Sequence, residues 1–399
     1  MDGTYRWGGG AVAVAVALTL GGPAPARSAD VGGADGWNVS FGGLINTFAV
    51  NARWDTGNNE EETTRVMSGF NPSKLNFHVK TPKSRDVEVS GHFQFAPSIQ
   101  SNKARFAGES LEVRVAEVDV TGRFGTFEIG RGWGVFNSQA IINDSASGLG
   151  VGRIPSPDRG GPTFGRIGTG YTYTDFAAKI VYATPSLGGF QLRAGLFDPV
   201  ETPFGGGSLP ANSGGTGAGA FETSAPRLEA EASYGVKSGS VAFKVWGGGL
   251  YQTITDKGTK SEATLGGADG GARIDVSGFA VTGAYTTTEG VGPSGFQANG
   301  FVCDAAGCRS SKTDFWYAGV DYTFGKDRKT TLGASTGRGK QKAEGGFGKV
   351  ENALDMAFVR HQLFPQLQIM VEYHQFKTTA ESIESEKYHA YVVGTQFDF

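Results

Sequence analysis

The chain has 399 residues, of which 39% are hydrophobic and 19% charged, and its formal net charge is −3. Charges of both signs are mixed along it, so we expect no basic surface and no nucleic-acid partner. Two cysteines in so long a chain exclude a fold built on disulfides, and a mean hydropathy of −0.23 excludes a bundle of apolar membrane helices. The 64 glycines and 12% aromatic residues suit many short strands joined by turns, as in transmembrane β-barrels.

The N-terminal region has the layout of a secretory signal. Arg6 precedes an apolar stretch, residues 8–22, which is too short to span a bilayer as a helix and is followed by small residues. We expect residues 1–29 to be a signal peptide, cleaved between positions 26 and 29, and residues 30–399 to form a single domain. An N-terminal membrane anchor is the alternative, although the stretch falls below the usual spanning length.

Apolar and polar residues alternate along much of the remaining chain. Examples of the apolar phase are Leu75, Phe77 and Val79, then Phe93 and Phe95, Leu228 to Tyr234, Trp316 to Tyr322, and Leu367 to Tyr373. A period of two is typical of strands with one apolar and one wet face. A basic residue turned toward lipid at mid-depth costs roughly 2–4 kcal/mol, so we expect the polar phase to face inward. That phase includes Lys74, His78, Lys80, His92, Lys179, Arg193, Glu229, Glu231, Lys244, Asp321, Asp355, Glu372 and His374.

Short and long connections alternate between these segments. Short ones lie near residues 81–86, 121–124, 185–188, 237–239, 269–271, 325–327 and 364–366. Long ones lie near residues 51–72, 98–110, 135–174, 198–225, 253–258, 288–312, 339–350 and 378–386. Seven short and eight long connections join sixteen strands, and about sixteen strands leave an aqueous lumen. The pattern predicts an all-β fold, a transmembrane antiparallel β-barrel of about 16 strands.

The C-terminal segment reads as the strand that closes this barrel. Tyr391, Val393, Phe397 and Phe399 fall on one face, and the chain stops at the strand's last residue. A bare strand edge needs a partner, and pairing with the first strand would remove both edges.

Three stretches resemble general bacterial porins. Residues 114–131 (RVAEVDVTGRFGTFEIGR) are similar to the RxAxVxLxGxFGxxxxGR segment of that family, and residues 180–190 (IVYATPSLGGF) resemble its YxSPxxxGF hairpin. The terminal aromatic residue, Phe399, completes the resemblance.

The resemblance implies a multi-pass protein of the Gram-negative outer membrane, usually a homotrimer surrounded by outer-membrane lipid. Its long third loop would fold inward to narrow a channel for ions and small hydrophilic solutes. The resemblance also implies that the outer-membrane assembly machinery reads the aromatic residue at position 399.

The same resemblance suggests where the channel is narrowest. In related porins the arginine of the GR motif joins a basic cluster on the wall, which makes Arg131 and Arg114 candidates for the constriction. Arg131 shares the parity of Phe127 and Ile129, which look lipid-facing, so it can face the channel only if a bulge at residues 130–132 shifts the strand. An interfacial arginine near the barrel rim is the alternative.

The third loop, residues 135–174, departs from the family pattern. It has only two acids, Asp144 and Asp158, against three arginines, Arg153, Arg159 and Arg166. We expect these residues, together with Lys74 and His78, to line the constriction and to make the channel weakly anion-preferring or nearly unselective. Alternatively, some of the arginines hold the loop against acidic wall residues.

Cys303 and Cys308 lie in an external loop with four residues between them. An oxidising envelope favours a disulfide between them. A metal site would lack companion ligands beyond Asp304, so we expect neither a metal nor a cofactor.

Catalysis has little support in the sequence. The five histidines are scattered, with no GxSxG or HExxH motif near them, so we expect no enzyme. A passive diffusion channel is the favoured function. A substrate-specific channel and a non-conducting structural or adhesin barrel remain alternatives.

Overall fold

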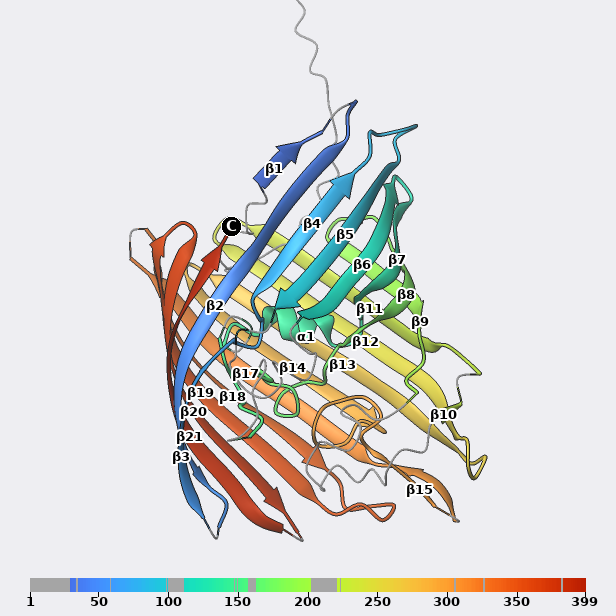
Figure 1. Cartoon of the computed structure of the whole chain (residues 1–399), viewed down its shortest axis with the longest axis vertical. Coiled ribbons are helices and arrows are strands. Elements are labelled where there is room, and N and C mark those ends of the chain that lie inside the picture. Colours follow the sequence, from blue (N-terminus) through green and yellow to red (C-terminus); the bar gives the residue numbers. More distant parts are fainter. Residues whose placement is uncertain are drawn as a thin grey trace, which may run out of the picture.

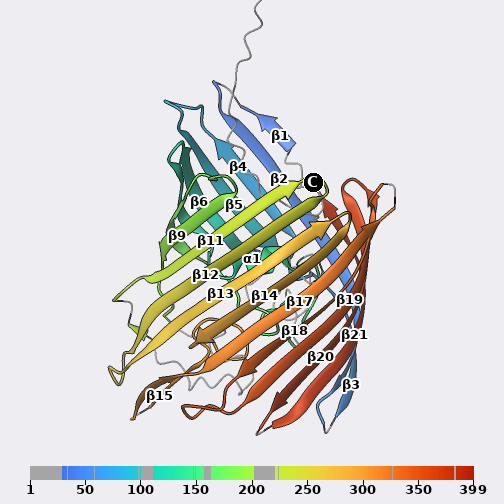
Figure 2. The same cartoon turned by 180° about the vertical axis from the view of Figure 1, so that it is seen from behind.

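The chain folds into an antiparallel β-barrel whose long strands tilt strongly around one axis (Figure 1, Figure 2). The computed structural model describes residues 29–33, 35–57, 59–97, 99, 111–146, 148, 150–156, 163–201, 221–222, 224–304, 306–325, 327–381 and 383–399. In this part of the chain, no helix is long and apolar enough to cross a membrane.

The elements follow one another as a series of hairpins with one short helix inside the barrel. In the N-terminal half they are β1 (Ala29–Gly32), β2 (Asn38–Asp55), β3 (Glu60–Met67), β4 (Lys74–Lys80), β5 (Glu88–Pro97), β6 (Leu111–Gly122), β7 (Gly125–Trp133), α1 (Ser138–Asn143), β8 (Phe176–Ala183) and β9 (Phe190–Phe197). In the C-terminal half they are β10 (Phe221–Glu222), β11 (Arg227–Ser238), β12 (Val241–Asp256), β13 (Glu262–Val276), β14 (Phe279–Glu289), β15 (Phe301–Asp304), β16 (Gly307–Ser310), β17 (Lys312–Phe324), β18 (Thr330–Gln341), β19 (Val350–Phe364), β20 (Leu367–Ala380) and β21 (Ile383–Asp398).

The wall is a closed ring with sixteen strand positions. β3 and β4 together occupy one position, because both pair with β2, one above the other. The short strands β1 and β10 add to neighbouring strands, and β15 pairs only with β16. The predicted fold class is therefore confirmed.

The ring closes where β21 pairs with β2. This ladder runs from the Leu44–Asp398 pair to the Asp55–Lys387 pair, and the backbone of Phe399 exchanges hydrogen bonds of 2.8 and 3.0 Å with Gly43. On β21, Tyr391 and Val393 are 65% and 59% exposed on the outside, whereas Tyr388 and Val392 are fully buried inside. The alternation expected for this segment is present.

Three expected connections are wrong. Residues 269–271 form no turn, because β13 continues through them and turns only at Ser277 and Gly278. Its glycines hide the alternation, and a Cβ on Gly271 would lie only 2.2 Å from the Trp246 ring. Residues 51–72 are largely strand, since β2 and β3 meet in a tight hairpin. Residues 378–386, the third case, are also largely strand, because β20 ends at Ala380 and β21 begins at Ile383.

The lumen is partly filled by packed side chains. The third loop, which we call L3 and define as residues 135–174, enters the barrel with α1 and packs against the inner wall. One apolar cluster joins Val151 and Ile154 of L3 to Leu354 and Met356 of β19. L3 therefore narrows the barrel from one side.

Candidate functional site

Acids on β11 hold the start of L3. The Oε2 atom of Glu229 accepts hydrogen bonds from Val135 N at 2.7 Å and from Phe136 N at 2.9 Å. Glu231 accepts hydrogen bonds from Ser138 Oγ at 3.1 Å and from Gln139 N at 3.3 Å. Hydrogen bonds to a carboxylate are roughly twice as strong as neutral ones, so these contacts fix where the loop enters the lumen.

Residues on β17, β20 and β21 hold the middle of L3. Ser145 donates to Asp321 at 2.5 Å, Val151 N donates to Glu372 at 3.1 Å, and Ile154 N donates to the Tyr388 hydroxyl at 2.8 Å. These two acids, like Glu229 and Glu231, face inward as expected. They bind the loop, however, rather than lining a wet wall.

Arg166 and Asp144 form a buried pair inside L3. Arg166 Nε lies 3.6 Å from Asp144 Oδ2, and both side chains are almost completely buried. The Arg166 guanidinium also donates to the Leu354 carbonyl at 3.0 Å and to the Ser335 hydroxyl. Both side chains are therefore buried rather than exposed at an open constriction. Arg166 holds L3 to the wall through a backbone carbonyl and a hydroxyl, not through an acidic wall residue as the alternative expected.

Arg153 lies among aromatic rings. Its guanidinium is 5.7 Å from the centroid of Phe164 and 5.1 Å from that of Phe376, and it donates to the Ile167 carbonyl at 3.1 Å. Burial lowers the pKa of this guanidinium from its ordinary value. Asp158 and Arg159, the other expected loop residues, lie outside the described residues.

The wall that faces L3 from β4 and β6 contains Lys74 and Arg114. Lys74 donates to Asn71 at 2.9 Å, and Arg114 pairs with Glu112 at 2.8 Å while its guanidinium lies 5.2 Å from the Phe176 ring. Each of these two predicted constriction residues therefore has its own partner on the wall, and their place at the constriction stays a prediction.

Arg131 does not face the lumen. The β7–β8 ladder runs through Arg131 without a register shift, and the β6–β7 ladder reaches it in the same register, so the bulge expected at residues 130–132 is absent. A Cβ on Gly132 would meet Glu117 and Lys179 of the inner wall, which places Arg131 on the outer face with Ile129. The irregularity lies instead at Arg114, the extra residue in the β5–β6 ladder. This outer-face position is compatible with the alternative interpretation of an interfacial arginine near the rim, which stays a prediction.

His78 belongs to a mixed-charge inner wall. Its ring stacks on His92 at 4.2 Å, and both lie opposite the outward-facing Phe77 and Phe93. On β6 to β9, a ladder of ion pairs continues this wall, with Lys179 between Glu117 and Glu128, at 3.0 and 2.5 Å, and Arg193 at 2.9 Å from Glu128.

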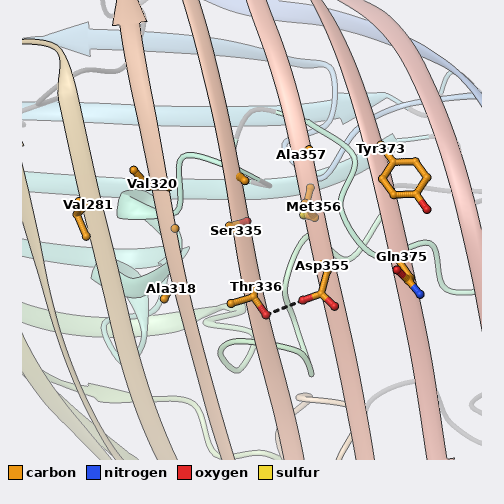
Figure 3. Close-up of a pocket in the computed structure, with 12 residues that line it drawn as sticks. Val281, Ala318, Val320, Ser335, Thr336, Asp355, Met356, Ala357, Tyr373 and Gln375 are labelled. Carbon is orange, nitrogen blue, oxygen red and sulfur yellow. Dashed lines mark hydrogen bonds between the residues drawn. The ribbon is translucent and has the colours of Figure 1, made fainter.

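Asp355 is the one acid of the expected inward set that faces outward. It accepts from Thr336 at 2.5 Å and pairs with Arg338 at 2.9 Å, beside an outer-face groove of about 590 Å³ (Figure 3). The polarity of β19 is reversed because its inner positions, such as Leu354 and Met356, pack against L3.

The loop between β14 and β17 was expected to be external, yet part of it lies inside the barrel. Val291, Phe296 and Ala298 are at most 2% exposed and pack against inner-wall or L3 side chains. The sequence does contain a signal of this inward packing, because no charged residue occurs between Glu289 and Asp304.

Farther along this loop, a disulfide joins Cys303 and Cys308, whose Cα atoms are 4.1 Å apart. Among the residues that the structure describes, no group of three or more His, Cys, Asp or Glu could hold a metal ion.

Comparison with known proteins places this geometry in context. Residues 11–381 match the family model described as Gram-negative porin, and no curated protein matches the chain. The anion-selective porin from Comamonas acidovorans is 15% identical, with 91% of this chain and 100% of that chain covered and a TM-score of 0.64.

Two further solved structures share the fold. The outer membrane channel DcaP of Acinetobacter baumannii is 14% identical, with coverage of 92% and 99% and a TM-score of 0.65. The outer membrane protein OmpT of Vibrio cholerae, in its trimer form, is 14% identical, with coverage of 92% and 100% and a TM-score of 0.54.

Proposed function

The chain belongs to the Gram-negative porin family and forms an outer-membrane channel. We propose that ions and small hydrophilic solutes cross the outer membrane through this channel by passive diffusion. The observation that carries this proposal is a closed sixteen-strand wall with a loop bound inside its lumen. The hydrogen bonds described above run from L3 to β11 and to β17–β21, and Val135 at the start of L3 also packs on Val181 of β8 and Phe197 of β9. The passage is therefore proposed to lie between L3 and the wall of β4 to β7.

The ion preference of this passage is expected to be weak. Arg166 is neutralised by Asp144, and the Lys179 ladder contains both signs. Arg114 is paired with Glu112, and the carboxylate of Glu386 acts electrostatically on Arg153. Lys74 and Arg153 form no direct ion pair within the part of the chain that the structure describes, and these two cations support a weakly anion-preferring or nearly unselective channel, because selectivity is set by charges at close range to the permeating ion.

The channel is proposed to be a homotrimer in outer-membrane lipid. Strands β4, β8 and β9 have only seven or eight residues, whereas a strand needs about 9–11 to span a bilayer. This low wall, with Arg131 on its outer face, would be shielded by a neighbouring copy. Native mass spectrometry should give a trimer, and a monomer alone would contradict this assembly.

The protein is also proposed to lose an N-terminal signal on maturation and to be no enzyme. Residues 1–29 lie almost wholly outside the described residues and are proposed to be removed as a signal, with cleavage between positions 26 and 29. The intact mass of the mature protein tests this. Assembly machinery would insert residues 30–399 as a single domain.

Esterase or lipase turnover by the pure protein, lost on a single Ser or His change, would move the function from channel to enzyme.

Recording from planar bilayers tests the channel directly. Stepwise, ohmic currents in potassium chloride support passive diffusion. A saturable block by one solute would favour a substrate-specific channel. Absence of any current from correctly folded protein would favour a structural or adhesin barrel.

A further inference from the structure

The segment 291–299, which we call the inner loop, is a compact excursion into the lumen. All but one of its nine residues are buried, the exception being the half-buried Ser294. Its ends meet, since Gly300 N donates to Gly290 O at 3.1 Å and Ser311 N donates to Gly300 O at 2.7 Å. Loops normally run over the protein surface, so an external loop is not expected to have nearly all of its residues buried.

The inner loop is held by two distant parts of the wall. Gln297 Oε1 accepts a hydrogen bond from Arg227 of β11 at 2.8 Å. The carbonyl of Pro293 accepts one from Asn352 of β19 at 2.7 Å. Five strands separate β11 from β19 in the ring, so the inner loop spans the lumen beside this wall rather than following one strand.

The inner loop also packs directly on L3. Tyr173 N donates to Gly295 O at 2.8 Å, and the Phe296 ring lies 5.0 Å from Phe164 and 5.7 Å from Tyr173. The backbones touch as well, because a Cβ on Gly168 would lie 2.5 Å from the Ser294 carbonyl. L3 and the inner loop therefore form one continuous layer.

We propose that the inner loop is a second constriction element, which together with L3 sets the upper size of the solutes that pass. This inference rests on the proposed channel function and deepens it. The inner loop contains no charged side chain, so it limits solutes by size rather than by sign. Phe296 contributes the aromatic contacts between the two loops, with Phe164 and Tyr173.

The test replaces residues 291–299 with two glycines in the full chain. A short linker suffices because Gly290 and Gly300 are already hydrogen-bonded. We expect single-channel conductance to rise roughly twofold, because the narrowest part of the pore controls permeation, with little change in reversal potential. Liposome swelling should extend from monosaccharides to a trisaccharide such as raffinose. Removing residues 345–347 from the neighbouring external loop is the matched control and should change neither property.

Point variants decide the matter if the shortened chain fails to fold. Phe296→Ala should raise the current noise and the permeation rate of disaccharides, and Gln297→Ala should do so more weakly. Unchanged conductance and sugar range in folded Phe296→Ala protein would overturn the inference. If wild-type protein itself carries no current, the proposed channel function fails instead, so the two failures are distinguishable.

Discussion

Replacing Glu229 with alanine should detach the start of L3 from the barrel wall. This side chain is fully buried, and its Oε2 atom binds the backbone N–H groups of Val135 and Phe136 at 2.7 and 2.9 Å. Its other oxygen lies 2.9 Å from Arg227 Nε. Alanine removes all three contacts and leaves two buried donors and one buried cation.

The size of the effect follows from these contacts. Each buried donor left without an acceptor costs about 1–3 kcal/mol. Removing one partner of a buried ion pair costs about 3–5 kcal/mol. The two costs are not added, because they partly describe the same lost interactions of the Glu229 carboxylate. A loss of about 4 kcal/mol would raise the population of detached loop by roughly a thousandfold, since about 1.4 kcal/mol corresponds to tenfold.

Hydrogen exchange measured by mass spectrometry reports this detachment. Peptides covering Val135 and Phe136 should lose protection in the Glu229→Ala variant, and open-channel current noise should increase. The β11 ladder is unaffected, so the barrel should stay folded. Glu128→Ala is the matched control, because Glu128 pairs with wall cations rather than with L3. Wild-type protection of both amides in Glu229→Ala would refute the reasoning.

Three further predictions concern the terminus, the charge of L3 and the disulfide. Deleting Phe399, whose backbone pairs with β2, should lower the folded yield in the outer membrane far more than Phe399→Tyr, and equal yields would show that the terminus is dispensable. Arg153→Gln should move the reversal potential in a potassium chloride gradient a few millivolts toward cations, because selectivity follows nearby charge, and an unchanged potential would remove Arg153 from the permeation path. The loop peptide containing Cys303 and Cys308 should gain two hydrogens on reduction, and replacing both cysteines with serine should loosen this hairpin by roughly 2 kcal/mol. Two free thiols in freshly purified protein would contradict the bridge.

The barrel was predictable because alternation with a period of two is a local property of each strand. It placed β21 correctly, including the outward Tyr391 and the inward Tyr388. In β13, glycines interrupt the alternation of polar and apolar residues, so residues 269–271 were expected to be a turn. Gly271 instead leaves room for the Trp246 ring. The predicted number of strands is nevertheless correct, because the turn wrongly expected at residues 269–271 and the turn missed at Ser277 cancel in the count.

The charged site was less predictable because it depends on where loops pack inside the lumen. The rule that inner positions are polar fails on β19, where Leu354 meets L3 and Asp355 faces outward. Arg166 illustrates the same limit, since only tertiary packing reveals that it is buried against Asp144. Arg131 has the parity that its sequence indicates, and the bulge that its flanking glycines and the family resemblance together favoured is absent.

Single-channel recording of the purified full-length protein in planar bilayers tests the central claim most directly. Discrete, ohmic conductance steps in potassium chloride are expected, with a reversal potential near zero or slightly anion-preferring in a salt gradient. Folded protein that inserts into the bilayer but carries no current would contradict the account. Strong cation selectivity would contradict the arrangement of charges proposed for the passage.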